Sequence, residues 1–240
     1  MRSSGVPATL LALAAVLFAA TIALPVLAPG NGGGNPHTQP AAPAAGEVLT
    51  TASPEAVAVL DTLSGAICFT DDDGSGAYDL GEAVYFTPQG SCAADVSGND
   101  LRLVATAGQA FGTKVRATHS DFGNPYADFA VTVSSYDTDG DTLWSLGDGA
   151  YLDVGGDGAV SVGDVRLTAL GDMAAGTAVG AGDSDVNNAL APMVYGQATE
   201  WAYWDGDGDH DYTNSDVVYI DATSRGFATP GSIRLTSLSG

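Results

Sequence analysis

Positive charge is scarce in this chain. Its 240 residues include 29 Asp and Glu but only 7 Lys and Arg, which gives a net charge of −22, and Lys114 is the only lysine. A nucleic-acid partner requires a basic surface that displaces the counterions of the phosphate backbone. No segment of this sequence offers such a surface, so we expect no nucleic-acid binding.

The sequence also lacks the motifs of common enzyme classes. Its three histidines, His37, His119 and His210, have no plausible nucleophile close in sequence, and no GxSxG, HExxH or phosphate-binding loop occurs. Carboxylates abound, but the best placed of them belong to a repeated pattern that predicts a different chemistry. We therefore expect that the protein is not an enzyme.

Cysteine occurs only twice, as Cys68 and Cys92, with an acidic segment between them. No CxxC motif or further ligand indicates a zinc site. In an exported protein, two such cysteines most often form a disulfide, which here closes a loop of about 25 residues and contributes roughly 3 kcal/mol. Two buried free thiols are the alternative.

The sequence does contain an acidic pattern that occurs three times. It reads DDDGSGAYDLGEAVYF from Asp71, DTDGDTLWSLGDGAYL from Asp137 and DGDGDHDYTNSDVVYI from Asp205. Each copy has an acidic residue at the first, third and twelfth places, Gly at the fourth, and Tyr or Trp at the eighth. One acidic, solvated turn would need no ligand to explain it. Copies that match at all these places favour a shared binding function.

This spacing is typical of a calcium loop, because Ca²⁺ takes six to eight hard oxygen ligands and a twelve-residue loop can wrap around it. Each loop also offers the carbonyl of its seventh residue, and the eighth residue turns away from the ion into apolar packing. The predicted side-chain ligands are Asp71, Asp73, Ser75, Asp79 and Glu82 in the first copy, Asp137, Asp139, Asp141, Ser145 and Asp148 in the second, and Asp205, Asp207, Asp209, Thr213 and Asp216 in the third.

Two further stretches repeat the frame in weaker form. The segment DVGGDGAVSVGD has Gly155 at its third place, so we expect a weaker site with the ligands Asp153, Asp157, Ser161 and Asp164. The segment DATSRGFATPGS from Asp221 carries Arg225 among the would-be ligands, and we expect it to bind no ion. The sequence thus predicts about four calcium sites.

The loops resemble the calcium loop of type I dockerins, which is EF-hand-like. The resemblance rests on Gly at the fourth place, Ser or Thr at the ninth and Asp at the twelfth. Helices follow dockerin loops, whereas here each loop leads into a β-branched or aromatic triplet such as Val84-Tyr85-Phe86 or Val218-Tyr219-Ile220. We therefore expect a mostly β fold of repeated strand, calcium loop and strand units, either β-sandwich-like or a modular β array.

The repeat is longer than the loop. The stretch from Arg102 and the stretch from Arg166 align without a gap at an offset of 64 residues. This frame divides the folded part, 47–240, into a half unit, two whole units and a partial unit, with the boundaries 47–68, 69–134, 135–202 and 203–240. An array that starts and ends within a unit leaves strand edges that seek partners. Either the two ends close on each other, or the end of one molecule completes the next.

The N-terminal segment predicts export. Residues 6–28 carry no charge, and as a helix they would span ~34 Å, enough to cross a bilayer core. We expect an apolar helix over 1–28, acting as a membrane anchor, a signal peptide or a filament core helix, followed by a Gly/Pro/Ala linker over 29–46. Gly5-Val6-Pro7 and the apolar run after it resemble the start of archaeal type IV pilins, which implies cleavage after Gly and helix packing in a filament.

Together these features predict an exported, cell-surface or extracellular calcium-binding structural protein. We expect it to self-associate as the subunit of a pilus-like filament or a surface layer. The alternative is a membrane-tethered adhesin that recognises a glycan or another protein. The two differ in whether the terminal half units are completed by a neighbour or within the chain.

Overall fold

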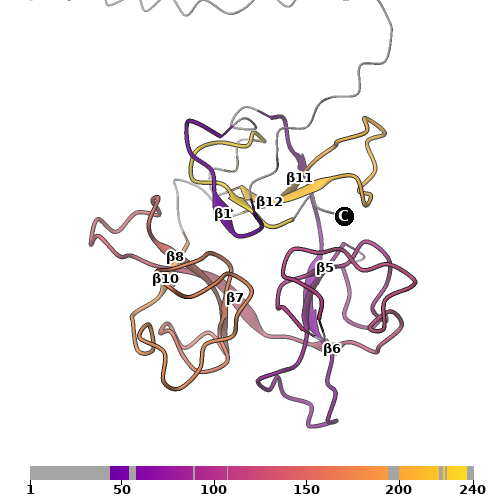
Figure 1. The fold of residues 1–240 in the computed structure, drawn as a ribbon, viewed down its shortest axis with the longest axis horizontal. Helices are drawn as coiled ribbons and strands as arrows, with labels where there is room; N and C mark the ends of the chain where they lie inside the picture. Colours follow the sequence, from indigo (N-terminus) through magenta and orange to yellow (C-terminus); the bar gives the residue numbers. More distant parts are fainter. Residues whose placement is uncertain are drawn as a thin grey trace, which may run out of the picture. The chain divides into compact units, whose positions relative to one another are not determined.

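All regular elements in the described part of the chain are β-strands. The computed structural model describes residues 44–53, 58–88, 90–106, 108–193, 200–221, 224 and 226–236. They belong to the second of two compact units, 39–240, while the first unit, 1–38, lies outside them. Thirteen strands form three antiparallel sheets, which we call blades 1, 2 and 3 (Figure 1). The prediction of a mostly β fold is confirmed.

The predicted N-terminal helix over 1–28 and almost all of the linker lie outside the described residues. Within the described ranges, no helix combines the length and apolar character needed to cross a membrane.

Blades 1 and 2 are each built from one continuous stretch of chain. Blade 1 has the strand order β5-β4-β3-β6, and blade 2 has the order β9-β8-β7-β10. In each of these two blades, a strand, an acidic loop, the tyrosine strand, a second loop and an Arg-containing strand follow one another along the chain. The bounds are β3 (Ala66–Phe69), β4 (Val84–Thr87), β5 (Leu101–Arg102), β6 (Ala127–Asp128), β7 (Val131–Tyr136), β8 (Gly149–Val154), β9 (Val165–Arg166) and β10 (Ala191–Pro192).

Blade 3 is assembled from both ends of the described chain. Its strand order is β1-β13-β12-β11-β2, so segments from the start of unit 39–240 flank segments from its end. Glu47 pairs with Arg234, and Asp61 pairs with Tyr203. The bounds are β1 (Glu47–Val48), β2 (Asp61–Thr62), β11 (Glu200–Trp204), β12 (Val217–Asp221) and β13 (Ile233–Arg234).

The N-terminal segment fills the place in blade 3 that consecutive chain fills in the other blades. Gly46 donates to the Arg234 carbonyl at 2.7 Å, as Gly176 donates to the Arg166 carbonyl at 2.7 Å. Leu49 likewise bonds to the Ser232 carbonyl. Of the two possibilities that the repeat frame allows, the structure has the first: the ends close on each other within one chain.

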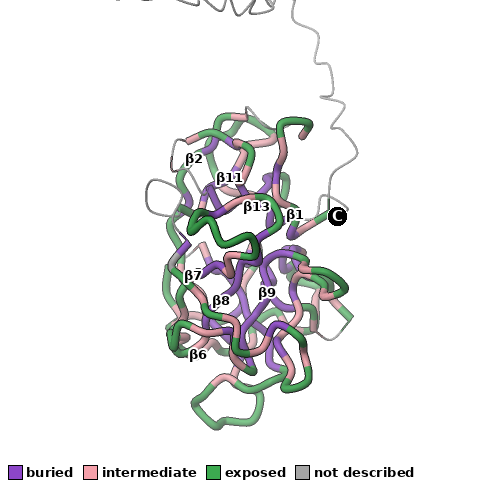
Figure 2. The backbone as a smooth tube through the Cα atoms, turned by 90° about the vertical axis from the view of Figure 1, so that its left-hand side faces the viewer, coloured by how far each residue is buried: buried purple, intermediate pink, exposed green. Residues whose placement is uncertain are grey.

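The three blades share one apolar core. The tyrosine of each middle strand lies outside this shared core, buried in a smaller apolar cluster of its own blade, with Tyr85 at 0%, Tyr151 at 0% and Tyr219 at 1% exposed. The main buried cluster takes residues from all three sheets, and the Phe86 ring stacks on Trp201 across blades 1 and 3 at 4.3 Å. Figure 2 shows the buried backbone running through the strands while the loops are exposed. The core therefore fixes the strands from which the acidic loops project.

Candidate metal sites in the blade loops

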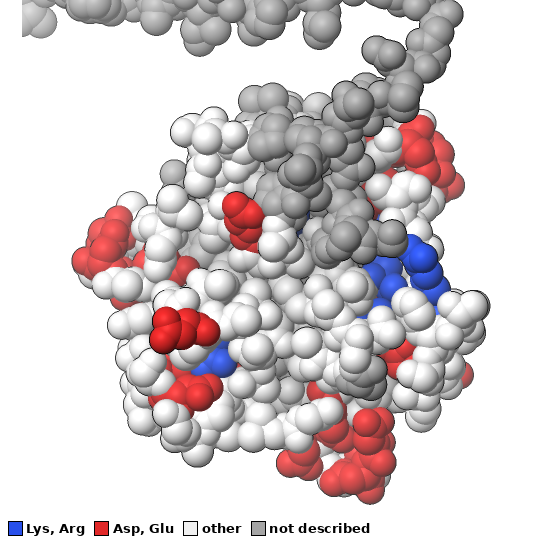
Figure 3. Space-filling model, in the orientation of Figure 1, with Lys and Arg blue, Asp and Glu red and all other residues white. Residues whose placement is uncertain are grey.

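Each blade carries two loops, and five of these six loops keep the same twelve-residue frame. A first loop leads into the tyrosine strand (71–82, 137–148 and 205–216), and a second loop follows that strand (87–100, 153–164 and 221–232). Acidic side chains gather in separate patches at the edge of the face in Figure 3. The first loops are thus solvent-facing projections held at both ends by buried strands.

The carboxylate at the first place of each loop holds the turn that follows. It accepts a hydrogen bond from the backbone N–H at the sixth place in all three first loops, with distances of 2.8, 2.8 and 2.9 Å. The bond from Thr142 lowers the pKa of Asp137, and the bond from His210 lowers that of Asp205. These aspartates are therefore held in the ionised form that a cation requires. The first-place residues are Asp71, Asp137 and Asp205.

The carboxylate at the twelfth place closes each loop. Its two oxygens accept the N–H groups of the second and ninth places, as Asp148 does from Thr138 at 2.9 Å and from Ser145 at 2.7 Å. The same pair of bonds is made by Glu82 and Asp216. All three side chains belong to buried residues, with 3 to 5% exposure for Asp148 and Glu82 and 0% for Asp216. The end of each first loop is therefore fixed before any ion binds.

Carboxylates of each first loop converge on one point. In each loop, one oxygen from each of three acids lies within 4.8 Å of the others. Nine of the predicted ligands are brought together in this way. The groups are Asp71, Asp73 and Glu82 in blade 1, Asp137, Asp139 and Asp141 in blade 2, and Asp205, Asp207 and Asp216 in blade 3.

The other predicted ligands of the first loops lie in the same turns. Ser75 Oγ donates to the Ala77 carbonyl at 2.8 Å and lies 3.4 Å from Asp79 Oδ2. Asp209 Oδ1 accepts the N–H of Asp211 at 2.8 Å. Ser145 and Thr213 bond through their backbone N–H to the twelfth-place carboxylate. These bonds hold the fifth- and ninth-place groups within their loops, but Asp79, Asp148 and Asp209 are not members of the convergent groups found in the described residues.

The sixth place has the same backbone conformation in each of these loops, and an EF-hand loop has Gly at this place because the turn is sharp. All five loops that keep the twelve-residue frame are left-handed here, with φ between 63° and 77°. Two of these residues are not glycine: Thr142 at 66° and His210 at 63°. Left-handed backbone costs an L-residue roughly 1–2 kcal/mol. The turn geometry is therefore kept even where the residue opposes it.

The second loop of blade 2, 153–164, has the frame without the convergence. Asp153, Asp157 and Asp164 make the expected bonds, including Ser161 Oγ to Asp157 Oδ2 at 2.7 Å. They are not among the convergent groups found in the described residues. Burial, with the nearby charge of Asp153, raises the pKa of Asp164 to about 6. A cation at this site would therefore compete with protons for the Asp164 carboxylate.

The second loop of blade 3, 221–232, keeps the scaffold without acidic ligands at its end. Asp221 accepts the N–H of Gly226 at 3.1 Å, and Ser232 Oγ takes the place of the closing carboxylate by accepting the N–H of Thr229. Arg225, on which the prediction of no ion rests, lies outside the described residues.

Sequence reasoning missed the second loop of blade 1, because it is longer and starts at Thr87 with Pro88. Asp100 stands in its closing place and accepts the N–H of Ser97 at 2.6 Å through Oδ2, and Tyr126 donates to the same oxygen. Asp100 is 0% exposed, and among the residues that the structure describes its Oδ1 has no hydrogen-bond partner. In the other loops with a closing acid, the N–H of the second place fills this role, and proline has none. The available signal was the Leu101-Arg102 pair, which follows Asp100 as Val165-Arg166 follows Asp164.

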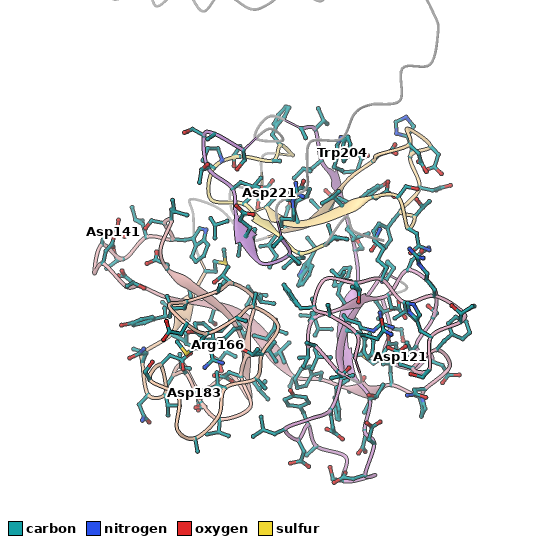
Figure 4. All side chains as sticks on the ribbon, viewed as in Figure 1. Asp121, Asp141, Arg166, Asp183, Trp204 and Asp221 are labelled. Carbon is teal, nitrogen blue, oxygen red and sulfur yellow. A yellow bond between two sulfur atoms is a disulfide. The ribbon has the colours of Figure 1, made fainter. Side chains whose placement is uncertain are left out.

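A second missed feature is a buried Arg–Asp–Tyr network in two blades; Figure 4 labels one member of each, Arg166 and Asp121. Arg166 Nη2 and Nε both bond to the Asp185 carboxylate, at 2.7 and 2.8 Å, and the Tyr151 hydroxyl donates to Asp185 Oδ2. Burial opposes ionisation of Asp185, but the bonds from Arg166 and Tyr151 outweigh it and lower its pKa. Blade 1 repeats the network with Arg102, Asp121 and Tyr85. These two arginines therefore form ion pairs inside their own blades.

The predicted disulfide is confirmed. Cys68 of β3 bonds to Cys92 in the second loop of blade 1, with a Cα–Cα distance of 5.5 Å. The bridge encloses the first loop of blade 1.

Blade 2 also has a hollow of about 640 Å³. Its wall combines the apolar side chains of Tyr136, Leu170 and Met173 with the polar ones of Asp172 and Asp183. Arg166 Nη2 holds Asp183 through Oδ2 at 2.8 Å, so this carboxylate has a fixed direction at the hollow.

Comparison with protein-family models, with curated proteins and with solved structures gave no match to this chain.

Proposed function

We propose that this chain is an exported calcium-binding surface protein in which one Ca²⁺ binds each first loop. The observation that supports this most directly is the convergence of three carboxylates, with oxygens within 4.8 Å of one another, in all three first loops. The rest of each loop supplies hydroxyl and carbonyl oxygens, which are the ligands that a hard cation of high coordination number prefers. The loop 153–164 is proposed as a fourth and weaker site.

Calcium then acts as a structural component. Without an ion, each first loop concentrates negative charge on a chain that already carries −22. An ion that binds only the folded loop stabilises the fold by mass action, by about 2.7 kcal/mol per site at a free concentration a hundredfold above the dissociation constant. Three such sites would contribute on the order of 8 kcal/mol. The proposed role is non-catalytic.

The cellular role that the geometry favours is a tethered binding module. Blade 3 is completed by β1 and β2 of the same chain, so the repeat unit that the sequence leaves incomplete is filled without a neighbour. The hollow in blade 2 supports the same proposal, because an aromatic ring beside a fixed carboxylate suits a sugar ring or a polar protein side chain. In this proposal the apolar segment 6–28 anchors the module at the cell surface.

A pilus-like filament or surface layer stays a second proposal. Its support is the N-terminal sequence, in which residues 6–28 could pack as a shared helical core. The subunits would then assemble through this segment, and each blade would stay complete within its own chain.

Thermal unfolding tests the calcium proposal. The melting temperature should fall by on the order of 20 °C when excess chelator replaces millimolar calcium, since 1 kcal/mol shifts a domain of this size by roughly 2–4 °C. The triple variant Asp73→Asn, Asp139→Asn, Asp207→Asn should melt in calcium much as the original chain melts in chelator. Magnesium at equal concentration is the control. Equal melting in calcium and in chelator would refute the proposal.

Electron microscopy of the cell-derived protein in calcium separates the two roles. Single particles that bind glycan or protein ligands support the tethered module. Ordered filaments formed by chains whose blade 3 is already closed by β1 and β2 support assembly through the N-terminal segment.

A further inference from the structure

The aromatic residue at the eighth place of each first loop reaches into a neighbouring blade. Trp144 of blade 2 donates from Nε1 to the Gly231 carbonyl of blade 3 at 2.8 Å. Tyr212 of blade 3 donates from its hydroxyl to the Asn99 carbonyl of blade 1 at 3.2 Å. These contacts are separated by 87 and 113 residues in sequence, so they join the blades directly.

The third junction repeats the arrangement through ring packing. Tyr78 of blade 1 lies beside Gly163 of blade 2, where a Cβ on the glycine would stand 4.0 Å from the ring. Tyr78, Trp144 and Tyr212 therefore lead from blade 1 to blade 2, from blade 2 to blade 3 and from blade 3 to blade 1. The contacts form a closed cycle with one direction.

The three contacted residues hold the same position in their loops. Asn99, Gly163 and Gly231 each directly precede the residue that closes a second loop, and all are left-handed, with φ of 73°, 102° and 96°. The residue after each of them is fully buried. An aromatic side chain from one blade thus meets the next blade at the point where its second loop rejoins the core.

One junction carries an additional cation. Lys114 Nζ donates to the backbone carbonyls of Thr213 and Asp216, and it lies 4.4 Å from the centre of the Tyr212 ring. The matching positions in the other blades are Ala178 and Val48, which cannot make this contact. Blade 1 therefore contacts the first loop of blade 3 through both Asn99 and Lys114.

We propose that these junctions are latches that couple calcium binding around the three blades. The inference rests on the calcium sites proposed above. The aromatic residue stands between two proposed ion ligands, the carbonyl at the seventh place and the group at the ninth. An ion that orders this stretch fixes the aromatic against the next blade, which holds that blade's second loop in place. By linkage, order in the second loop favours ion binding in the loop that latches onto it.

Calcium titration of the full chain tests the coupling. Later ions should bind about fivefold or more tightly than the first, because the binding energy is shared across junctions. The double variant Trp144→Phe, Tyr212→Phe keeps an aromatic ring at both places but removes both donors, and its binding should lose most of this cooperativity while the number of bound ions is unchanged. Tyr203→Phe is the matched control, since Tyr203 donates to His210 within blade 3 at 3.2 Å. It should keep the cooperativity.

Amide hydrogen exchange tests the direction of the coupling. Asp139→Asn removes an ion ligand from blade 2, so calcium should protect residues 226–236 of blade 3 less in this variant. Protection of 97–103 in blade 1, which depends on the latch from blade 3, should change less. Protection lost equally in both segments would overturn the proposal.

The outcomes separate the two proposals. Calcium binding without cooperativity in the original chain, or cooperativity that survives in the double variant, overturns the latches alone. No calcium binding by the original chain overturns the proposed function.

Discussion

Blades 2 and 3 reach the same architecture by different routes. Blade 2 uses one stretch, 131–192, whereas blade 3 joins its last three strands to two strands from the start of unit 39–240. The register is nevertheless the same, since Val179 donates to the Asp164 carbonyl at 2.7 Å and Leu49 donates to the Ser232 carbonyl at 2.8 Å. The position of a segment in a blade is therefore set by its own side chains and hydrogen bonds, and chain connectivity adds only the entropy of closing a longer loop.

Removing the closing segment should have the largest effect on this comparison. Deleting residues 44–53 takes away the bonds of Gly46 and Leu49 and exposes the edge of β13, so we expect blade 3 to lose its cooperative unfolding transition. A synthetic peptide of residues 44–63 added to the deleted chain should restore part of the transition, as measured by calorimetry. The same peptide should leave the full chain unchanged. A deleted chain that melts like the full one would show that the closure is dispensable.

Removing the disulfide tests whether blade 1 depends on calcium less than blade 2 does. Cys68 and Cys92 are 24 residues apart and enclose the first loop of blade 1. The double variant Cys68→Ser, Cys92→Ser should lower the free energy of unfolding by about 3 kcal/mol. Urea unfolding should show a greater loss in chelator than in calcium, because the bridge and the ion restrain the same loop. An equal loss in both conditions would mean that they act independently.

The substitution Pro88→Ala should have the smallest effect and should stabilise the protein. It restores the N–H that Asp100 Oδ1 lacks, and a hydrogen bond to a charged group contributes about 1.5–3 kcal/mol. The lost rigidity of proline offsets up to about 1 kcal/mol, so we expect a net gain of roughly 1 kcal/mol at pH 7. Pro125→Ala, at an exposed proline, controls for the change in rigidity.

The gain should depend on pH. Burial raises the pKa of Asp100 above its usual value, so ionisation of this carboxyl costs more in the folded protein than in the unfolded chain. Stability from a group with a raised pKa is present below its unfolded value and is lost as pH rises through the folded value. The new bond favours the ionised form, so the gain should appear above the titration of Asp100 and vanish near pH 3. A gain of equal size at pH 3 and pH 7 would contradict this account.

Local features were predictable where residue type alone decides them. The β-branched and aromatic triplets became strands β4, β8 and β12, and the acidic frame marked the turns at which carboxylates converge. The paired cysteines also indicated their bond. In each case the deciding interactions lie within about two dozen residues of one another.

Contacts between residues far apart in the chain could not be predicted from the sequence, because several contact partners were equally plausible for each residue. The repeat frame left open whether a neighbour or the same chain completes blade 3. The eighth-place aromatics were expected to anchor their own loops, and nothing in the sequence indicates that Trp144 reaches Gly231. Asp100 was missed because Pro88 and two extra residues disguise its loop. The aspartate partners of Arg102 and Arg166 lie 19 residues further along the chain, and no motif in the sequence marks them as partners.

The closure of blade 3 also has a mechanical consequence. Chain that leads in from the N-terminal side enters the described structure at Ala44 and immediately forms β1, which runs antiparallel to β13. A force applied through that chain pulls first on the bond between Gly46 and Arg234 and then on the next, one at a time. Such peeling meets less resistance than shearing a whole strand at once. Under tension this protein should part first at β1, releasing length while the disulfide-bonded blade 1 and the continuous blade 2 stay folded.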